Sequence, residues 1–172
     1  MKKIEIESNI SISDYRKLVY FNSIGKKKWM SFVFMGALTV CTAIVIYSAF
    51  IAKEFNLLSN VALFYFAFLG MSTLVLERNI RKFAKEKDNL INKKQEITIR
   101  DNGIKVCNFL KKDGENYSWN IVSNAFETKN YIYLYIVNKQ IVIIPKNSMI
   151  TSDLKSIQNI LGNKLKERYI KN

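Results

Sequence analysis

The side chains that could do chemistry in this 172-residue chain are few and scattered. His is absent, which removes the commonest general base and a frequent metal ligand. Cys41 and Cys107 lie far apart and match no metal-binding spacing, so two reduced, buried thiols are expected. The sequence also lacks a Gly-rich phosphate loop and a G-x-S-x-G elbow. We therefore predict no enzymatic activity, no metal ion and no cofactor.

The remaining polar candidates lie in the second half of the chain. Asp101, Asp113 and Glu127 fall in or beside predicted turns, so solvation at the surface explains them. Lys146 follows a predicted strand and could meet a phosphate, although a solvated lysine is the alternative. Two aromatic rings could form a ligand platform, with core or rim packing of a sheet as the alternative. The candidate ligand or partner surface therefore comprises Tyr117, Trp119 and Lys146.

The net charge of +13 is distributed unevenly along the chain. Over half of the excess positive charge lies before the first and after the second of two apolar runs, and the connector between the runs is neutral. Basic residues on one side only are typical of the cytoplasmic side of a membrane protein. Basic residues there could meet anionic headgroups at about 1 kcal/mol each, or act only to set the topology. No recognition motif accompanies the charge, so nucleic-acid binding is not expected. The predicted membrane-surface residues are Lys26, Lys27, Lys28, Arg78, Arg81, Lys82 and Lys85.

Two long apolar runs occupy the middle of the chain. Trp29–Ala52 has no charged residue, His, Asn, Gln or Pro, and Phe55–Leu76 has only two Asn residues among its strongly polar positions. About 20 apolar residues suffice to span a bilayer. Neither run shows the polar stripe of a soluble helix, and a signal peptide would not be followed at once by a second run. We predict transmembrane helices at about 30–51 and 57–76, an external turn near Lys53–Asn56, and both termini in the cytoplasm.

Shorter elements flank the apolar runs. The alternation of Ile4 and Ile6 with charged residues predicts a half-buried strand near the N-terminus. The stretch that follows predicts a short helix capped by Ser13 or Asp14, lying either on the membrane surface or against the soluble domain. The second membrane helix is expected to continue into the cytoplasm to about Lys87.

From Gln95 onward the pattern changes to short β segments. An Asp-Asn-Gly turn at 101–103 separates the first two strands, and Asp113-Gly114 predicts another turn. Three further strands, separated at 129–130 and 138–139, end at Pro145.

The chain finishes with a predicted amphipathic helix capped by Thr151 or Ser152. Its acidic first turn suits the positive end of the helix dipole. Its apolar face comprises Leu154, Ile157, Ile160, Leu161 and Leu165.

These elements predict an α+β membrane protein with a transmembrane helix hairpin and a cytoplasmic antiparallel β-domain. Residues 1–25 supply a strand and a short helix that join the cytoplasmic domain. Residues 26–87 form the hairpin with its basic extension, and residues 88–172 form the β-domain with its closing helix. About seven strands are expected if the N-terminal one joins the sheet, and six if it does not.

The stretch from Tyr117 to Met149 resembles the bacterial YcxB-like family. The likeness rests on Tyr117–Asn120 before a strand, the "YIYLY" strand, and the "IIPK" exit before the last helix. The N-terminal "SDYRKLVYF" ahead of two membrane helices is similar as well. The resemblance implies a small protein of the bacterial inner membrane whose cytoplasmic domain has a pleckstrin-homology-like fold. It carries over no active residues, and Asn147 and Met149 depart from the basic and aromatic residues usual in the family.

We expect a non-enzymatic, membrane-anchored module that binds a protein partner, a second copy of the chain or anionic lipid headgroups. One alternative is an immunity or resistance protein against a membrane-active toxin or bacteriocin. Another is an accessory subunit of a membrane transporter or signalling complex. The apolar runs contain no charge, so an ion or proton path through them is not expected.

Overall fold

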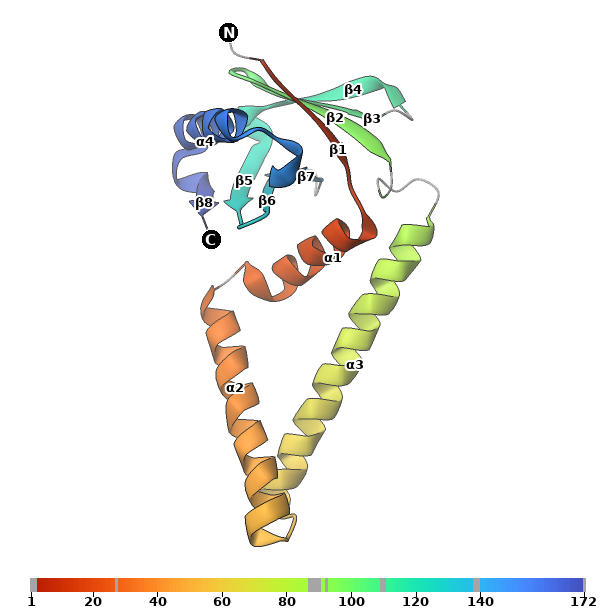
Figure 1. Ribbon diagram of the computed structural model, residues 1–172, viewed down its shortest axis with the longest axis vertical. Helices are drawn as coiled ribbons and strands as arrows, with labels where there is room; N and C mark the ends of the chain where they lie inside the picture. Colours follow the sequence, from red (N-terminus) through yellow and green to blue (C-terminus); the bar gives the residue numbers. More distant parts are fainter. Residues whose placement is uncertain are drawn as a thin grey trace. The chain divides into compact units, whose positions relative to one another are not determined.

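The computed structural model describes residues 3–26, 28–86, 91, 93–108, 111–137 and 140–171. The side chains of residues 28, 108 and 111–113 are outside this description. The chain divides into two compact units (Figure 1). The helical unit comprises residues 12–89, and the β-unit combines residues 1–11 with residues 90–172.

The helical unit contains three α-helices and two π-helical turns. In chain order these are α1 (Ile12–Tyr20), η1 (Phe21–Gly25), α2 (Lys28–Ile46), η2 (Tyr47–Ala52) and α3 (Leu57–Lys85). Helix α1 begins at Ile12, so Ser13 and Asp14 lie inside its first turn and the prediction that either caps it was wrong.

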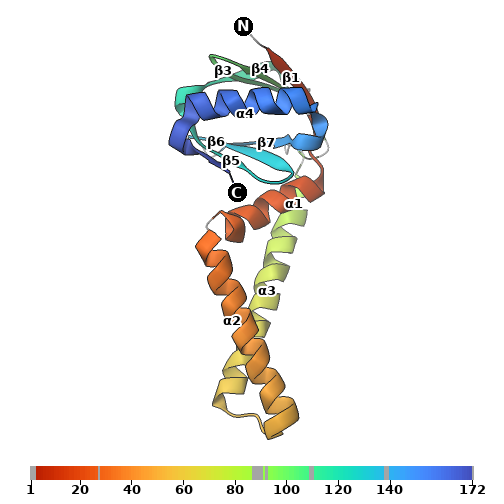
Figure 2. The same cartoon turned by 60° about the vertical axis from the view of Figure 1, so that its left-hand side comes forward.

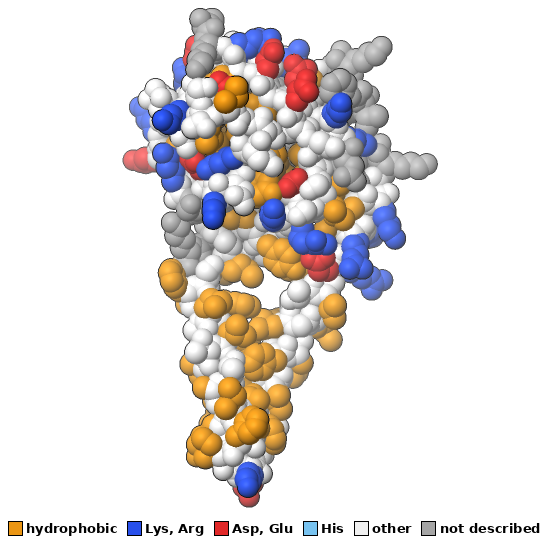
Figure 3. All heavy atoms as spheres, viewed as in Figure 1, with side chains coloured by type: hydrophobic (Ala, Val, Ile, Leu, Met, Phe, Trp, Pro, Cys, Tyr) orange, Lys and Arg blue, Asp and Glu red, His pale blue; other side chains and the backbone are white. Residues whose placement is uncertain are grey.

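Two helical segments, Trp29–Ala52 and Leu57–Lys85, are long and apolar enough to cross a membrane, as judged by length and composition. Figure 3 shows hydrophobic side chains covering their visible surface, and Phe32 on α2 is 76% exposed. The hydroxyls of Thr39 and Thr42 donate to the carbonyls four residues earlier, at 3.0 and 2.7 Å, which satisfies these hydroxyls within the helix itself. The prediction that the second helix continues beyond its apolar part was confirmed, because α3 is unbroken to Lys85.

A short turn joins the two apolar helices. Lys53 adopts the left-handed conformation, with φ 52°, and ends η2. The side chain of Asn56 then caps α3 by accepting a hydrogen bond from the Ser59 amide at 3.1 Å. Small side chains at this end of the helical unit, Ser48 and Ala62, are buried.

Helix α1 packs on the end of α3 that lies farthest from this turn. The Arg16 Nε lies 2.9 Å from Oε1 of Glu77, and the Tyr20 hydroxyl donates to the same oxygen at 3.2 Å. The ring of Tyr15 stacks on Phe83 with centroids 4.5 Å apart. No sequence pattern indicated this contact, because its partners stand about 60 residues apart in the chain.

The β-unit contains two four-stranded sheets and a helix. Sheet A has the order β1-β2-β3-β4, all antiparallel, and sheet B has the order β7-β6-β5-β8. In sheet B, β8 pairs in parallel with β5. The strands are β1 (Ile4–Asn9), β2 (Lys94–Arg100), β3 (Gly103–Asn108), β4 (Lys111–Ser118), β5 (Val122–Glu127), β6 (Tyr131–Ile136), β7 (Ile141–Pro145) and β8 (Tyr169–Lys171).

Helix α4 (Thr151–Leu165) runs along the two sheets (Figure 2) and completes their shared core. Its predicted apolar face was confirmed: three of the residues are buried and the other two pack against the core. Strand β1 buries Ile4 and Ile6 and exposes the residues between them, as its alternation predicted. The core is therefore built from all three layers, including the strand that precedes the helical unit.

The pairing of β1 with β2 shows how the two units are connected. Asn9 lies opposite Lys94, so the strands on either side of the 78-residue helical unit are direct antiparallel neighbours. The helical unit is thus an insertion into what would otherwise be a β-hairpin connection. The N-terminal strand joins the sheet, and the six-strand alternative was wrong.

Three other sequence predictions were wrong. Asp113 and Gly114 lie within β4 instead of forming a turn. Gly114 stands opposite a register shift in β3, and a Cβ there would clash with Cys107 Sγ, so this glycine serves a close approach of two strands. The N-cap of α4 is Ile150 and no side chain caps it, so Thr151 and Ser152 do not act as caps. An eighth strand, β8, occupies residues that the amphipathic pattern had assigned to the last helix.

The turns at 101–103 and 129–130 were confirmed, whereas the one predicted at 138–139 lies outside the described residues.

We expect residues 3–11, joined by a short Gly/Ser linker to residues 90–172, to fold without the helical unit. The fragment 90–172 alone should stay largely unfolded, because it loses the burial of Ile4 and Ile6, worth about 1.5–3 kcal/mol each. That loss is large against a typical domain stability of about 5–15 kcal/mol. Circular dichroism and amide shift dispersion in NMR spectra would distinguish the two chains.

The matched control is the linked chain with Ile4→Asp and Ile6→Asp, which should resemble the fragment. A native-like, dispersed spectrum from fragment 90–172 alone would contradict the role given to β1.

Candidate functional site

Four of the predicted membrane-surface residues form a stripe on α3, named here the basic stripe: Arg78, Arg81, Lys82 and Lys85. Their spacing of three and four residues places them on one helical face. All four are exposed, and within the described part of the chain none makes a hydrogen bond or ion pair. The opposite face carries the buried Ile80 and the contacts of Glu77 and Phe83 with α1.

The three lysines that precede the first apolar helix are described only in part. Lys26 is exposed at the end of η1. Lys27 lies outside the described residues, as does the side chain of Lys28.

The structure does not bring Trp119 into a ligand platform. Trp119 is 6% exposed and belongs to the core of the β-unit. Its indole N–H lies 3.2 Å from the Arg100 carbonyl oxygen and 3.1 Å from that of Asp101, so it donates to the end of β2 and the turn that follows. This geometry favours the packing alternative for the ring and satisfies its one polar atom.

Tyr117 lies near the edge of sheet A, on β4. Its ring packs partly against the core, and its hydroxyl contacts a Glu115 carboxylate oxygen and lies 2.5 Å from Gln140 Oε1. Burial, and then the neighbouring Glu115, raise the pKa of the Tyr117 hydroxyl. Tyr117 is therefore a neutral hydrogen-bond donor and not a base.

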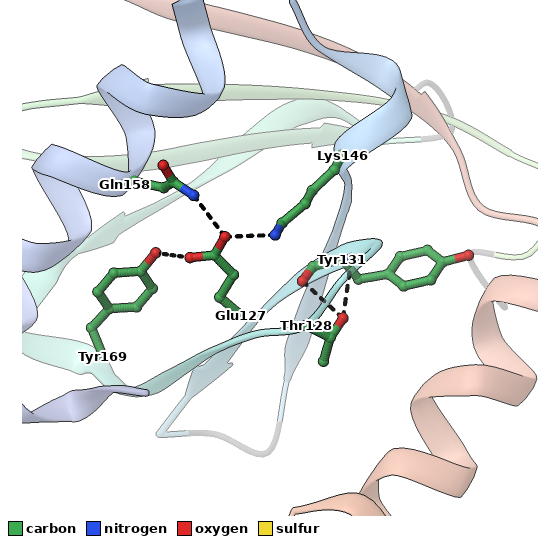
Figure 4. A network of polar contacts seen from close by, with 6 residues as sticks. All are labelled: Glu127, Thr128, Tyr131, Lys146, Gln158 and Tyr169. Atoms are coloured by element: carbon green, nitrogen blue, oxygen red, sulfur yellow. Dashed lines mark hydrogen bonds and ion pairs between the residues drawn. The ribbon is translucent and has the colours of Figure 1, made fainter. Parts of the chain in front are cut away.

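Lys146 belongs to a polar network that the sequence did not reveal, named here the Glu127 cluster (Figure 4). Its centre is Glu127, which is 7% exposed, so the prediction of a solvated carboxylate was wrong. Lys146 Nζ donates to Oε1 at 2.5 Å and Gln158 Nε2 donates to the same oxygen at 2.7 Å. The Tyr169 hydroxyl donates to Oε2.

The chain positions the Glu127 cluster by bringing four elements together. Glu127 is the last residue of β5, Lys146 begins the short η4 (Lys146–Ser148), Gln158 lies on α4 and Tyr169 starts β8. The Thr128 side chain closes the β5–β6 turn by accepting from the Tyr131 amide at 3.1 Å. The cluster therefore ties η4, α4 and β8 to the end of β5.

The electrostatics of the cluster favour an ionised Glu127. Burial alone would raise the pKa of Glu127, but the hydrogen bonds from Lys146, Tyr169 and Gln158, together with the lysine charge, outweigh burial and lower the pKa. Burial and the neighbouring carboxylate raise the pKa of the Tyr169 hydroxyl. Both carboxylate oxygens of Glu127 thus accept hydrogen bonds. The cluster therefore has a structural role and offers no free base for proton transfer.

Among the residues that the structure describes, no group of three or more His, Cys, Asp and Glu side chains could hold a metal ion. Cys41 and Cys107 are both free thiols.

These features define an α+β protein in which a β-unit of two sheets and one helix carries a pair of long apolar helices. Residues 99–161 match the family model of YcxB-like proteins, which confirms the resemblance seen in the sequence. The match runs from the end of β2 into α4 and includes Glu127, Lys146 and Gln158. A comparison with curated proteins found no match.

Replacing Lys146 with Met should destabilise the β-unit by about 3–5 kcal/mol, because it leaves the buried Glu127 charge without its cation. The double variant E127Q/K146M should be more stable than K146M, since it removes the unpaired charge. Urea unfolding of the full chain in neutral detergent would measure both effects. With Trp29→Phe as background, Trp119 is the only tryptophan and reports on the β-unit alone.

Lys155→Met is the matched control, because Lys155 is an exposed lysine on α4, and its effect should stay within about 0.5 kcal/mol. Equal stabilities of K146M and E127Q/K146M would contradict the assignment.

The lowered pKa of Glu127 also predicts how the stability of the β-unit depends on pH. The ionised carboxylate contributes fully at pH values above its ordinary pKa of 4.5. That contribution is lost as the pH falls through the lowered pKa of the folded state. The difference in unfolding free energy between the wild type and Glu127→Gln should therefore be constant at pH values above about 4.5 and should narrow as the pH falls below 4.5. Urea unfolding followed by Trp119 fluorescence, at about pH 7 and about pH 3, would measure this difference in unfolding free energy. The same difference at both pH values would mean that the Glu127 carboxylate is not ionised in the folded state.

Proposed function

We propose that the protein is a non-enzymatic, membrane-anchored interaction module. Helices α2 and α3 anchor it in the bacterial inner membrane, and the β-unit faces the cytoplasm, where it binds a protein partner or anionic lipid headgroups. The alternatives of an immunity protein and an accessory subunit stay predictions from the sequence.

The observation that carries the proposal is the pairing of Asn9 with Lys94. The chain leaves the β-unit after β1 and must return to the neighbouring strand β2. A helical insertion that crosses a membrane between these strands must therefore cross it an even number of times. The two apolar helices and the short turn between them supply two crossings. This connectivity supports a hairpin with both termini on one side.

The charges support the cytoplasm as that side. The turn carries one Lys and one Glu and is neutral, whereas basic residues flank the other ends of both apolar helices. The basic stripe is exposed and suited to anionic headgroups, at about 1 kcal/mol per residue near the surface. Glu77, the one carboxylate at the start of the stripe, is paired with Arg16 and so does not oppose this attraction.

Two further observations support binding in preference to catalysis. The buried carboxylate of the Glu127 cluster is saturated with donors. Two sheets closed by a C-terminal helix agree with the pleckstrin-homology-like domain that the resemblance implies.

Cysteine labelling in intact cells would test the topology. In a chain with Cys41→Ser and Cys107→Ser, Glu54→Cys in the turn should react with a membrane-impermeant maleimide added outside. The matched control, Lys85→Cys on the exposed end of α3, should react only after the cells are permeabilised. Reporters fused before Met1 and after Asn172 should both register the cytoplasm. Labelling of K85C in intact cells, termini on opposite sides, or recovery of the chain in the soluble fraction would contradict the proposed anchor.

A further inference from the structure

Sheet A has a hollow whose lining includes Tyr117, a residue of the predicted ligand surface. The hollow has a volume of about 420 Å³ and lies where the β2–β3 turn meets β4. Gly103 is one of the lining residues, and it is paired with Arg100 on one side and Ser118 on the other. A Cβ at Gly103 would clash with the Tyr117 carbonyl, so this position requires glycine. No side chain therefore projects into the hollow from this position.

The outer position of the hollow follows from the alternation of the strands. Ile99 and Ile104 are neighbours in the same strands and are buried in the core, so Arg100 and Lys105 point to the other face. The exposed Ser118 lies in the same row as Arg100. Ile104 and Tyr117, which belong to or pack against the core, also line the hollow, whereas no residue of the Glu127 cluster does.

The lining of the hollow is rich in hydrogen-bond donors and contains no carboxylate. Arg100 and Lys105 supply positive charge, and the amides and hydroxyl of Asn102, Asn116 and Ser118 supply neutral donors. An arginine guanidinium matches the geometry of a phosphate group in two parallel hydrogen bonds. We infer that this hollow binds the phosphate group of an anionic ligand.

The two cations are available for such a ligand. Within the described part of the chain, neither the guanidinium of Arg100 nor the ammonium of Lys105 makes a hydrogen bond or ion pair. Arg100 lowers the pKa of the Glu5 carboxyl, but Lys3 lowers it more. Glu5 already forms an ion pair with Lys3 on its own strand. The charge of Arg100 is therefore not neutralised inside the fold.

The inference rests on the proposed function and deepens it, because it names the chemistry that the β-unit recognises. Phosphate can come from a lipid headgroup or from a soluble phosphorylated compound, and both present the same anionic oxygens. The volume of the hollow exceeds that of a bare phosphate ion, so the group that carries the phosphate also has room.

An NMR titration of the ¹⁵N-labelled full chain with inorganic phosphate, in nanodiscs of neutral phosphatidylcholine, would test the inference. The amides of Asn102 and Gly103 should shift in a saturable way. Arg100→Gln with Lys105→Gln should weaken the binding at least fivefold. The matched control, Lys129→Gln with Lys155→Gln, removes two exposed lysines elsewhere on the β-unit and should leave the affinity unchanged.

The lipid composition of the nanodiscs separates the two sources of phosphate. If the headgroup is the ligand, discs with phosphatidylglycerol should shift the same amides and compete with added phosphate. If the ligand is soluble, glycerol 3-phosphate should shift them and phosphatidylglycerol should not. No saturable shift with phosphate, equal affinity in R100Q/K105Q, or a response only to an acidic peptide would overturn the inference. Failure of the membrane anchor would appear in the labelling of whole cells and not in this titration.

Discussion

The pairing of β1 with β2 is the constraint on which the rest of the structure depends. These strands are neighbours in sheet A and bury Ile6 and Ile97 side by side, yet the whole helical unit lies between them in the sequence. Closing so long a connection costs conformational entropy, which grows slowly with its length. The burial of isoleucines at the pairing offsets this cost, and the fold in turn requires the two ends of the helical unit to be adjacent. An apolar helix pair with a tight turn meets that requirement because it returns the chain to its starting side.

The Glu127 cluster holds the C-terminal segment in the fold, as the pairing with β2 holds the N-terminal strand. Strand β8 has three residues and pairs only with the edge of β5, which is little support for a terminal segment. The hydrogen bond from Tyr169 to Glu127 and one from Arg168 Nη1 to the Val122 carbonyl, at 2.8 Å, add polar contacts to that pairing. A buried carboxylate is costly unless it is paired and hydrogen-bonded. Lys146 and Gln158 meet this condition, so the cluster links helix, sheet and terminus as one polar network.

The features that could be predicted from the sequence are those encoded over short distances. Alternation in β1, the Asp-Asn-Gly turn and the apolar face of α4 each involve residues within about one helical turn or one hairpin, and each was found. The errors arise where distant segments meet. Glu127 looked like a turn residue because β5 ends there, and only α4 and β8, 30 or more residues later, bury it. Gly114 looked like a turn glycine because the bulge opposite it, in β3, leaves no signal in its own segment. The candidate site shows the same limit. The basic stripe was evident as a cluster of charges, whereas of the residues that line the hollow the sequence indicated Tyr117 but not Arg100 or Lys105.

The distribution of cations connects these observations with the large net charge. Two cations that lie in protein contacts have a carboxylate partner: Lys146 has Glu127 and Arg16 has Glu77. The basic stripe and the pair Arg100 and Lys105 have none among the described residues, and each lies on an exposed face. Unpaired like charges on a folded chain repel one another and add nothing to its stability. This repulsion is relieved only when an anion from outside the chain approaches. For this physical reason we place ligand recognition at these two surfaces and not at the Glu127 cluster, whose carboxylate is already saturated with donors.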